Sequence, residues 1–267
     1  MTSSRRSSNP FRAVPRPLRG WVIPVLLLFL WWAAFAFDWK ATALIVPISA
    51  VFERGVHEIE SGTFFAALGA SLWRMAIGFV IGSLAGLAVG VLMGLSQRAE
   101  ALFGPLFHAV KQVSHFAWIP LISVWFGMGD GGKIAFLALA AFFPLVLNTF
   151  EGVRSVPREL IELSRVLRFS RWQVWRRLVL PAAAPSILTG VQLALIYSWS
   201  ACLGAEYLLQ AGQGIGNLLQ DGQEHYLMDL VLFGVVVVGA VGFAINRLAR
   251  SLEGRLLRWR AGSQAHF

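Results

Sequence analysis

The stretch LWRMAIGFVIGSLAGLAVGVLMGL, residues 72–95, contains one charged residue, Arg74, in an otherwise apolar run. An α-helix of about 20 such residues crosses the hydrocarbon core of a membrane, which is about 30 Å thick. Five other stretches have a similar character: residues 21–38, 103–128, 133–150, 186–209 and 228–246. The whole chain is 57% hydrophobic and 14% charged, whereas soluble domains are about 25% charged. The sequence therefore predicts an all-α, polytopic membrane protein with about six transmembrane helices.

The third of these spans, residues 103–128, is the least regular. It carries His108, Lys111 and His115, and Pro120 interrupts it. Polar and helix-breaking residues at membrane depth are tolerated where they face protein or water. The first half of this span is therefore expected either at the interface or in a cavity lined by protein.

The second span carries a glycine at every fourth position. These glycines are Gly78, Gly82, Gly86, Gly90 and Gly94. Helix positions four apart share one face, and helices in lipid associate largely by close packing over small residues. We expect this face to contact another helix, either of the same subunit or of a second one.

The basic residues predict how the chain is oriented. Eighteen of the 23 lie before the first span, between spans two and three, between spans four and five, or after the sixth. With six spans these segments share one side, which the excess of Arg marks as cytoplasmic. The predicted organisation is a basic cytoplasmic segment 1–20, a first transmembrane helix 21–38, an extracytoplasmic segment 39–70, a membrane core 71–250 with a cytoplasmic loop 151–185, and a cytoplasmic tail 251–267. The net charge of +9 therefore indicates contact with the membrane surface rather than binding of nucleic acid.

The first span allows a second interpretation. Arginines followed by an apolar stretch and Ala34-Phe35-Ala36 have the form of a cleaved signal peptide. Trp31, Trp32 and the long lead that precedes them favour an uncleaved anchor.

The loop 151–185, EGVRSVPRELIELSRVLRFSRWQVWRRLVLPAAAP, is too patterned to be a simple linker. Leu160, Leu163 and Leu167 recur at helical spacing and predict a short amphipathic helix. Ser170 and Gln173 fit a capping box that begins a second helix. We expect that helix to run to Leu180 and to end before Pro181.

This loop resembles the EAA loop of binding-protein-dependent ABC-importer permeases. The family pattern is Glu-Ala-Ala, three residues, Gly, and a downstream Leu-Pro, and here Glu162-Leu163-Ser164 and Leu180-Pro181 match its ends. The flanking sequences IPLISVWFGMGDGGKIAFLALAAFFPLVLNTFEGVR, AAAPSILTGVQLALIYSWSACLGAEYL and GQGIGNLL are similar to the aliphatic sulfonate, taurine and nitrate branch. The resemblance covers roughly residues 70–260 and implies the type I permease fold of ABC importers.

The resemblance implies that this loop couples the permease to a cytoplasmic ATPase. The implied coupling residues are Glu159, Leu160, Glu162, Leu163, Ser164, Leu167, Arg168, Leu180 and Pro181. Arg168 stands where the family has Gly, so the turn after the first helix is expected either to differ or to hold Arg168 under strain. The implied partners are an ABC ATPase dimer, an extracytoplasmic substrate-binding protein and a second copy of the chain, with ATP and magnesium bound by the ATPase.

Polar residues inside spans are costly and are therefore candidates for a translocation path. We select Asn148, Trp199 and Glu206, although Glu206 could instead lie near the outer headgroups. Ser198 and Gln192 are interpreted as hydrogen-bonding neighbouring helices. Lys111 and His115 could assist an anion, although Lys111 could also extend to the cytoplasmic interface.

Other functional classes fit less well. Residues 127–134 approach a P-loop but have Ile134 where magnesium binding needs Ser or Thr. The five His residues are scattered, without metal-ligand spacing, so neither a metal site nor an enzyme is predicted. The alternative to an importer permease is a stand-alone secondary transporter or channel, which broken helices or acidic groups deep in the membrane would favour. In either case the expected location is the bacterial inner membrane, with both termini cytoplasmic.

Overall fold

The structure is a computed structural model that describes residues 23, 26, 29, 31–33 and 46–257, and every regular element in them is helical. The elements are α2 (Ile48–Glu60), α3 (Thr63–Leu95), α4 (Gln97–Lys111), η2 (His115–Trp118), α5 (Ile119–Phe126), α6 (Asp130–Arg154), α7 (Arg158–Val166), α8 (Arg171–Val174), the π-helical turn η3 (Trp175–Val179), α9 (Leu180–Leu208), α10 (Ile215–Glu224) and α11 (Met228–Leu256). The predicted all-α class is confirmed.

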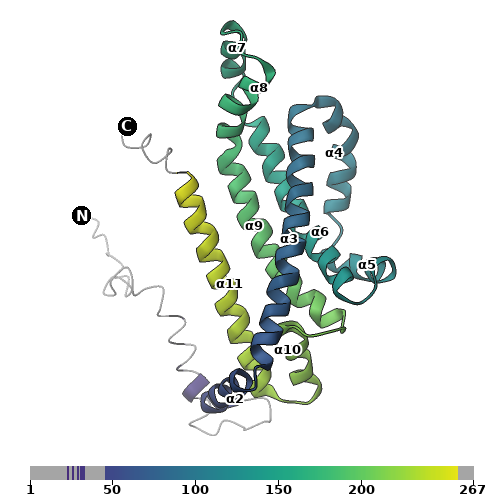
Figure 1. Ribbon diagram of the computed structural model, residues 1–267, viewed down its shortest axis with the longest axis vertical. Helices are drawn as coiled ribbons and strands as arrows, with labels where there is room; N and C mark the ends of the chain where they lie inside the picture. Colours follow the sequence, from purple (N-terminus) through teal and green to yellow (C-terminus); the bar gives the residue numbers. More distant parts are fainter. Residues whose placement is uncertain (1–22, 24–25, 27–28, 30, 34–45, 258–267) are drawn as a thin grey trace, which may run out of the picture.

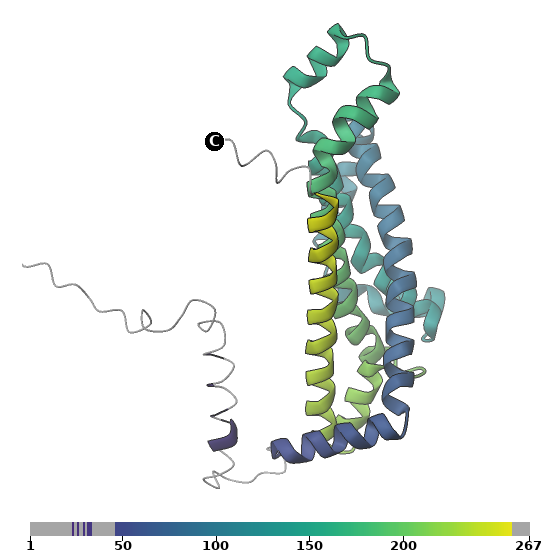
Figure 2. The same cartoon turned by 60° about the vertical axis from the view of Figure 1, so that its left-hand side comes forward.

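The long helices α3, α6, α9 and α11 run lengthwise through the molecule (Figure 1). Helices α7 and α8 project beyond one end of the bundle, called the α7 end below. At the opposite end, the α10 end, α10 closes the bundle and α2 lies across it (Figure 2). Among the described residues, four helical segments are long and apolar enough to cross a membrane, namely α3, α6, the continuous segment Arg171–Leu208, and α11. The first predicted span, residues 21–38, lies almost entirely outside the described residues.

The third predicted span, residues 103–128, does not form one helix. Helix α4 ends at Lys111, residues 112–114 are not helical, and the chain resumes as η2 and α5. In Figure 1, α4 runs along α3, whereas α5 turns aside from the bundle. Pro120 does not cause the break, because it occupies the first turn of α5, where a missing N–H costs no hydrogen bond.

Helix α6 lies at the centre of the bundle and packs against both α3 and α9. The repeated glycines of α3 face it. A Cβ atom added at Gly78 would lie 2.6 Å from Cβ of Leu137, and one added at Gly90 would lie 2.6 Å from Cβ of Thr149. Gly82, Gly86 and Gly94 likewise lie against α6. The glycine face thus brings two helix backbones of the same subunit together, where dispersion contacts can hold them.

The helix that begins after Ser170 continues through Pro181, so the expected end at Leu180 is wrong. The segment Arg171–Leu208 is a single run of α8, η3 and α9. A proline within a helix removes one hydrogen bond and crowds the preceding turn. The wider π-helical turn Trp175–Val179 lies immediately before Pro181 and accommodates its ring.

Candidate functional site

Helix α7 is defined by signals at both of its ends. Pro157 precedes it in an extended conformation, and Arg168 follows it with φ of 51°, in the left-handed region. The amide of Phe169 donates to the carbonyl of Ser164 (3.0 Å), and the amide of Arg168 donates to that of Arg165 (3.0 Å). This pair of bonds is a Schellman motif, in which glycine usually takes the left-handed position. Of the two expectations for this turn, the strained arginine is the one observed.

The turn between α7 and α8 is closed by the predicted capping box. The Ser170 hydroxyl accepts from the amide of Gln173 (3.2 Å), and the Gln173 side chain accepts from the amide of Ser170 (2.8 Å). These bonds satisfy donors that a helix N-terminus leaves free. Helix α7 therefore ends, and α8 begins, at fixed residues, and the turn between them has a defined shape.

Helix α7 has two apolar faces with different roles. Its inner face carries Ile161 and the buried Ser164. Ile161 packs on a buried cluster that includes Val153 and Val179. Its outer face carries three of the predicted coupling residues, Leu160, Leu163 and Leu167, all exposed, next to Val166. An exposed apolar surface on a projecting element is typical of a protein-docking site.

Of the remaining predicted coupling residues, Ser164 is buried on the inner face, and the other five fall into two groups. Glu159, Glu162 and Arg168 are exposed on the hairpin itself. Leu180 and Pro181 are exposed in the first turn of α9 and are not part of the outer face of α7.

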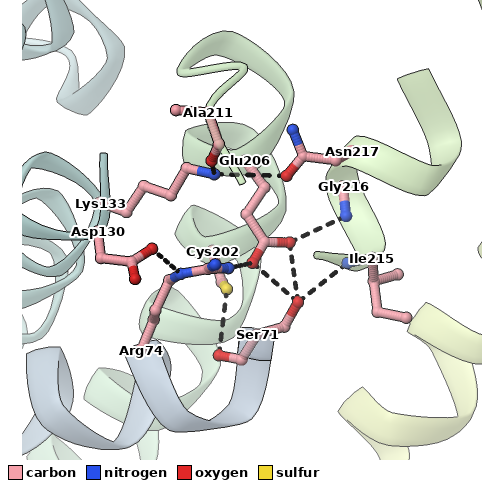
Figure 3. Close-up of polar contacts among 10 residues, drawn as sticks. All are labelled: Ser71, Arg74, Asp130, Lys133, Cys202, Glu206, Ala211, Ile215, Gly216 and Asn217. Carbon is pink, nitrogen blue, oxygen red and sulfur yellow. Dashed lines mark hydrogen bonds and ion pairs between the residues drawn. The ribbon is translucent and has the colours of Figure 1, made fainter. Parts of the chain in front are cut away.

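At the α10 end, Glu206 of α9 is fully buried in a cluster of polar side chains (Figure 3). Its carboxylate accepts from the hydroxyl of Ser71 (2.8 and 2.9 Å), from Arg74 (2.8 Å) and from the amide of Gly216 (2.9 Å). Arg74 also donates to Asp130 at the start of α6 (2.6 Å). The carboxylate thus joins α3, α9 and α10, and Arg74 extends the connection to α6.

A second buried cation completes this cluster. Lys133 of α6 has no exposed surface, and its ammonium donates to the carbonyl of Ala211 (2.5 Å) and to the side chain of Asn217 (3.3 Å). Two cations, Arg74 and Lys133, are balanced by two carboxylates, Glu206 and Asp130. Burying charges is costly unless they are paired and hydrogen-bonded, and here each has a partner.

The cluster fixes the chain between α9 and α10. Gly214 and Gly216 lie directly against Glu206, since a Cβ added at Gly216 would lie 2.7 Å from Cβ of Glu206 and one at Gly214 would overlap its carboxylate. The amide of Ile215 donates to the hydroxyl of Ser71 (3.0 Å). Gly214 and Gly216 therefore allow backbone amides to reach buried side chains.

The other two path candidates contact neighbouring helices. Trp199 is 5% exposed and donates from its indole N–H to the carbonyl of Val238 in α11 (3.2 Å). Asn148 is half-buried between α6 and α9, donates to the carbonyl of Pro144 (2.8 Å), and its own carbonyl accepts from Ser186 (2.7 Å). Asn148, Trp199 and Glu206 lie at different positions in the bundle, and the structure does not bring them together in one site.

Sequence reasoning selected Glu206 but missed the other side chains of the cluster, Ser71, Arg74, Asp130 and Lys133. A signal was present, because Arg74 and Glu206 are opposite charges in two apolar stretches. Intramembrane charges usually pair with one another. The spacing along the chain gives no indication of which charges meet.

The structure is thus a bundle of long apolar helices from which α7, with its exposed leucines, projects at one end. Residues 78–258 match the family described as "Binding-protein-dependent transport system inner membrane component", and the chain belongs to this family. It is therefore similar to the permeases of ABC importers over most of its length, as the loop and its flanking sequences indicated.

Curated relatives cover nearly the whole chain. It is 35% identical to the putative aliphatic sulfonates transport permease protein SsuC of Bacillus subtilis, covering 91% of this chain and 88% of that protein. It is 34% identical to the bicarbonate transport system permease protein CmpB of Synechococcus elongatus, covering 91% and 89%. Among solved structures, an amino acid ABC transporter matches with a TM-score of 0.62 at 16% identity, covering 75% of this chain and 97% of that one, which supports the fold.

Proposed function

We propose that this chain is the membrane-spanning permease subunit of an ATP-driven importer and forms the path for a small anion, an aliphatic sulfonate in the first instance. The observation that carries the coupling part of the proposal is the outer face of α7, where Leu160, Leu163 and Leu167 are exposed on a helix fixed at both ends. A groove on a cytoplasmic ATPase would cover this face and use Glu162 as an acidic contact.

The α7 end then faces the cytoplasm, because the arginine-rich loop 151–185 lies there. The α10 end faces the outside, where a substrate-binding protein would deliver the solute. Two copies of the chain and two ATPases make up the proposed complex, with ATP and magnesium on the ATPases. Both termini lie on the cytoplasmic side of the bacterial inner membrane in this arrangement.

The substrate class rests on the relatives. Sulfonate and bicarbonate permeases are almost equally similar to this chain, and both solutes are small oxyanions. The shared chemistry is a compact group with negative oxygens, and we place aliphatic sulfonates first, then taurine and nitrate.

The stand-alone transporter remains the second candidate, because the helix break after Lys111 is a feature that it would also have. The buried Glu206 does not favour it. Its carboxylate already accepts hydrogen bonds from Ser71, Arg74 and Gly216, which leaves no oxygen free to hold a coupling ion.

Copurification tests the proposal. The tagged chain, extracted from its native host in mild detergent, should bring down an ATPase in equal amount. Glu162→Arg should abolish both this recovery and uptake, because it places a cation at the acidic contact. Glu224→Arg makes the same charge change on α10 at the opposite end and should retain the recovery of the ATPase. A chain recovered alone that moves solute in liposomes without ATP would establish the stand-alone transporter instead.

A further inference from the structure

The break between α4 and η2 lies near half-depth in the bundle. The cavity beside it is also lined by Phe136 and Ala140 of α6. Ala138, which stands between those two residues in the sequence, packs on Gly82 near the middle of α3. The break is therefore far from both ends of the long helices.

Non-helical backbone at membrane depth is tolerated only where it is buried in protein or lines a water-filled cavity. Residues 112–114, which form the break, are exposed rather than buried. They border a cavity of about 370 Å³. The break therefore faces either water or the surface of another protein chain.

The cavity has a cationic and hydroxyl-bearing lining. Lys111, at the last turn of α4, meets Tyr197 and Ser200 of α9 there, together with His115. His115 is held in place by an edge-on contact with Phe143, with ring centroids 5.6 Å apart. None of the cavity's lining residues is acidic.

Lys111 differs from the other cations deep in the bundle. Arg74 has carboxylate partners, and Lys133 donates to a carbonyl and a side-chain amide. Within residues 46–257, Lys111 forms no ion pair. A cation at this depth is costly unless an anion or water stabilises it, and no carboxylate of the described residues pairs with Lys111.

We propose that this cavity is a transient binding site for a small oxyanion with a short apolar tail, such as an alkanesulfonate. The ammonium of Lys111 and the hydroxyls of Tyr197 and Ser200 would hold the oxygens, and the wall formed by Phe136 and Ala140 would contact the tail. The volume falls in the range of about 300–1,000 Å³ that is typical of small-molecule sites. The identification of the ligand as transported solute rests on the proposed function, whereas the preference for anions rests on the cavity alone.

Charge-selective labelling of a cysteine in the cavity tests the proposal. In a Cys202→Ala background, which removes the chain's one cysteine, Ser200→Cys is labelled in nanodiscs by two thiol reagents of similar size. One is anionic, sulfonatoethyl methanethiosulfonate, and the other is its cationic trimethylammonium counterpart. The full chain is used together with any ATPase that copurifies, both at rest and with ATP.

Relative to the rates of both reagents with a free thiol in solution, the anionic reagent should react faster than the cationic one. Lys111→Gln should reduce the ratio of the two rates by about tenfold or more, because a unit charge a few ångströms away acts here in a medium of low dielectric constant. Lys111→Arg should keep the ratio. Arg250→Gln, which removes an exposed charge from α11, should also keep it.

An unchanged ratio in Lys111→Gln would overturn the proposal, and so would a Ser200→Cys thiol that reacts with neither reagent in either state. Uptake of labelled ethanesulfonate is measured in parallel with the ATPase and binding protein. A chain that keeps the charge preference but imports nothing would contradict the proposed function alone. A chain that imports without any charge preference would contradict only the site.

Discussion

Replacing Glu206 with glutamine tests whether the buried cluster holds the α10 end together. Glutamine has the same shape and can still accept from Ser71 or Gly216, but it loses the charge that pairs with Arg74. A hydrogen bond to a charged group contributes about 1.5–3 kcal/mol, and removing one partner of a buried pair costs about 3–5 kcal/mol. Because glutamine keeps part of the hydrogen bonding, we expect the free energy of unfolding to fall by about 3 kcal/mol, the lower end of the range for a broken buried pair.

A loss of about 3 kcal/mol corresponds to a fall in the apparent melting temperature of about 6 to 12 °C for a chain of this size. Thermal unfolding of the purified protein in detergent measures this fall in melting temperature. Hydrogen exchange of residues 209–217 should also rise, because Glu206 holds this segment to α3.

The matched control is Glu224→Gln, which changes an exposed carboxylate on α10. It should alter stability by no more than about 0.5 kcal/mol. Equal melting temperatures for Glu206→Gln and the wild-type protein would show that the cluster does not stabilise the fold, and would refute the reasoning.

Two other substitutions test local packing and conformation. Arg168→Gly should stabilise the hairpin by about 1 kcal/mol, because a non-glycine residue in the left-handed region carries a cost of that order. Slower proteolysis at the α7 end would reveal this stabilisation, and faster proteolysis would contradict it. Gly82→Leu should prevent normal assembly, since its side chain would meet the backbone of Ala138, whereas at Gly69 nothing lies within 4 Å and the same change should be tolerated. Folded yield by size-exclusion chromatography compares the two, and equal yields would show that α3 and α6 do not need this close approach.

Several elements could be predicted from sequence because their signals are local. Apolar length indicated α3, α6, α9 and α11, and the Ser170–Gln173 pair indicated the start of α8. The sequence showed that Arg168 stands at an unusual position, but it could not predict the backbone conformation there. An arginine in place of Gly allowed either a different turn or a strained one.

The failures have a common cause. The helix break after Lys111 and the continuation through Pro181 depend on neighbouring backbone, because a break needs a cavity beside it and an internal proline needs the adjacent π-helical turn. Neither condition can be read from residues close in sequence.

The sequence alone determined that the chain is a helical membrane protein with a patterned loop of permease type, because hydropathy and helix signals act within a few turns. The tertiary structure decided which charges meet. Arg74 and Glu206 are 132 positions apart, and Arg74 and Asp130 are 56 apart. Pairing buried charges lowers a cost that each would carry alone, so their partners are chosen by the packing of whole helices and not by neighbours along the chain.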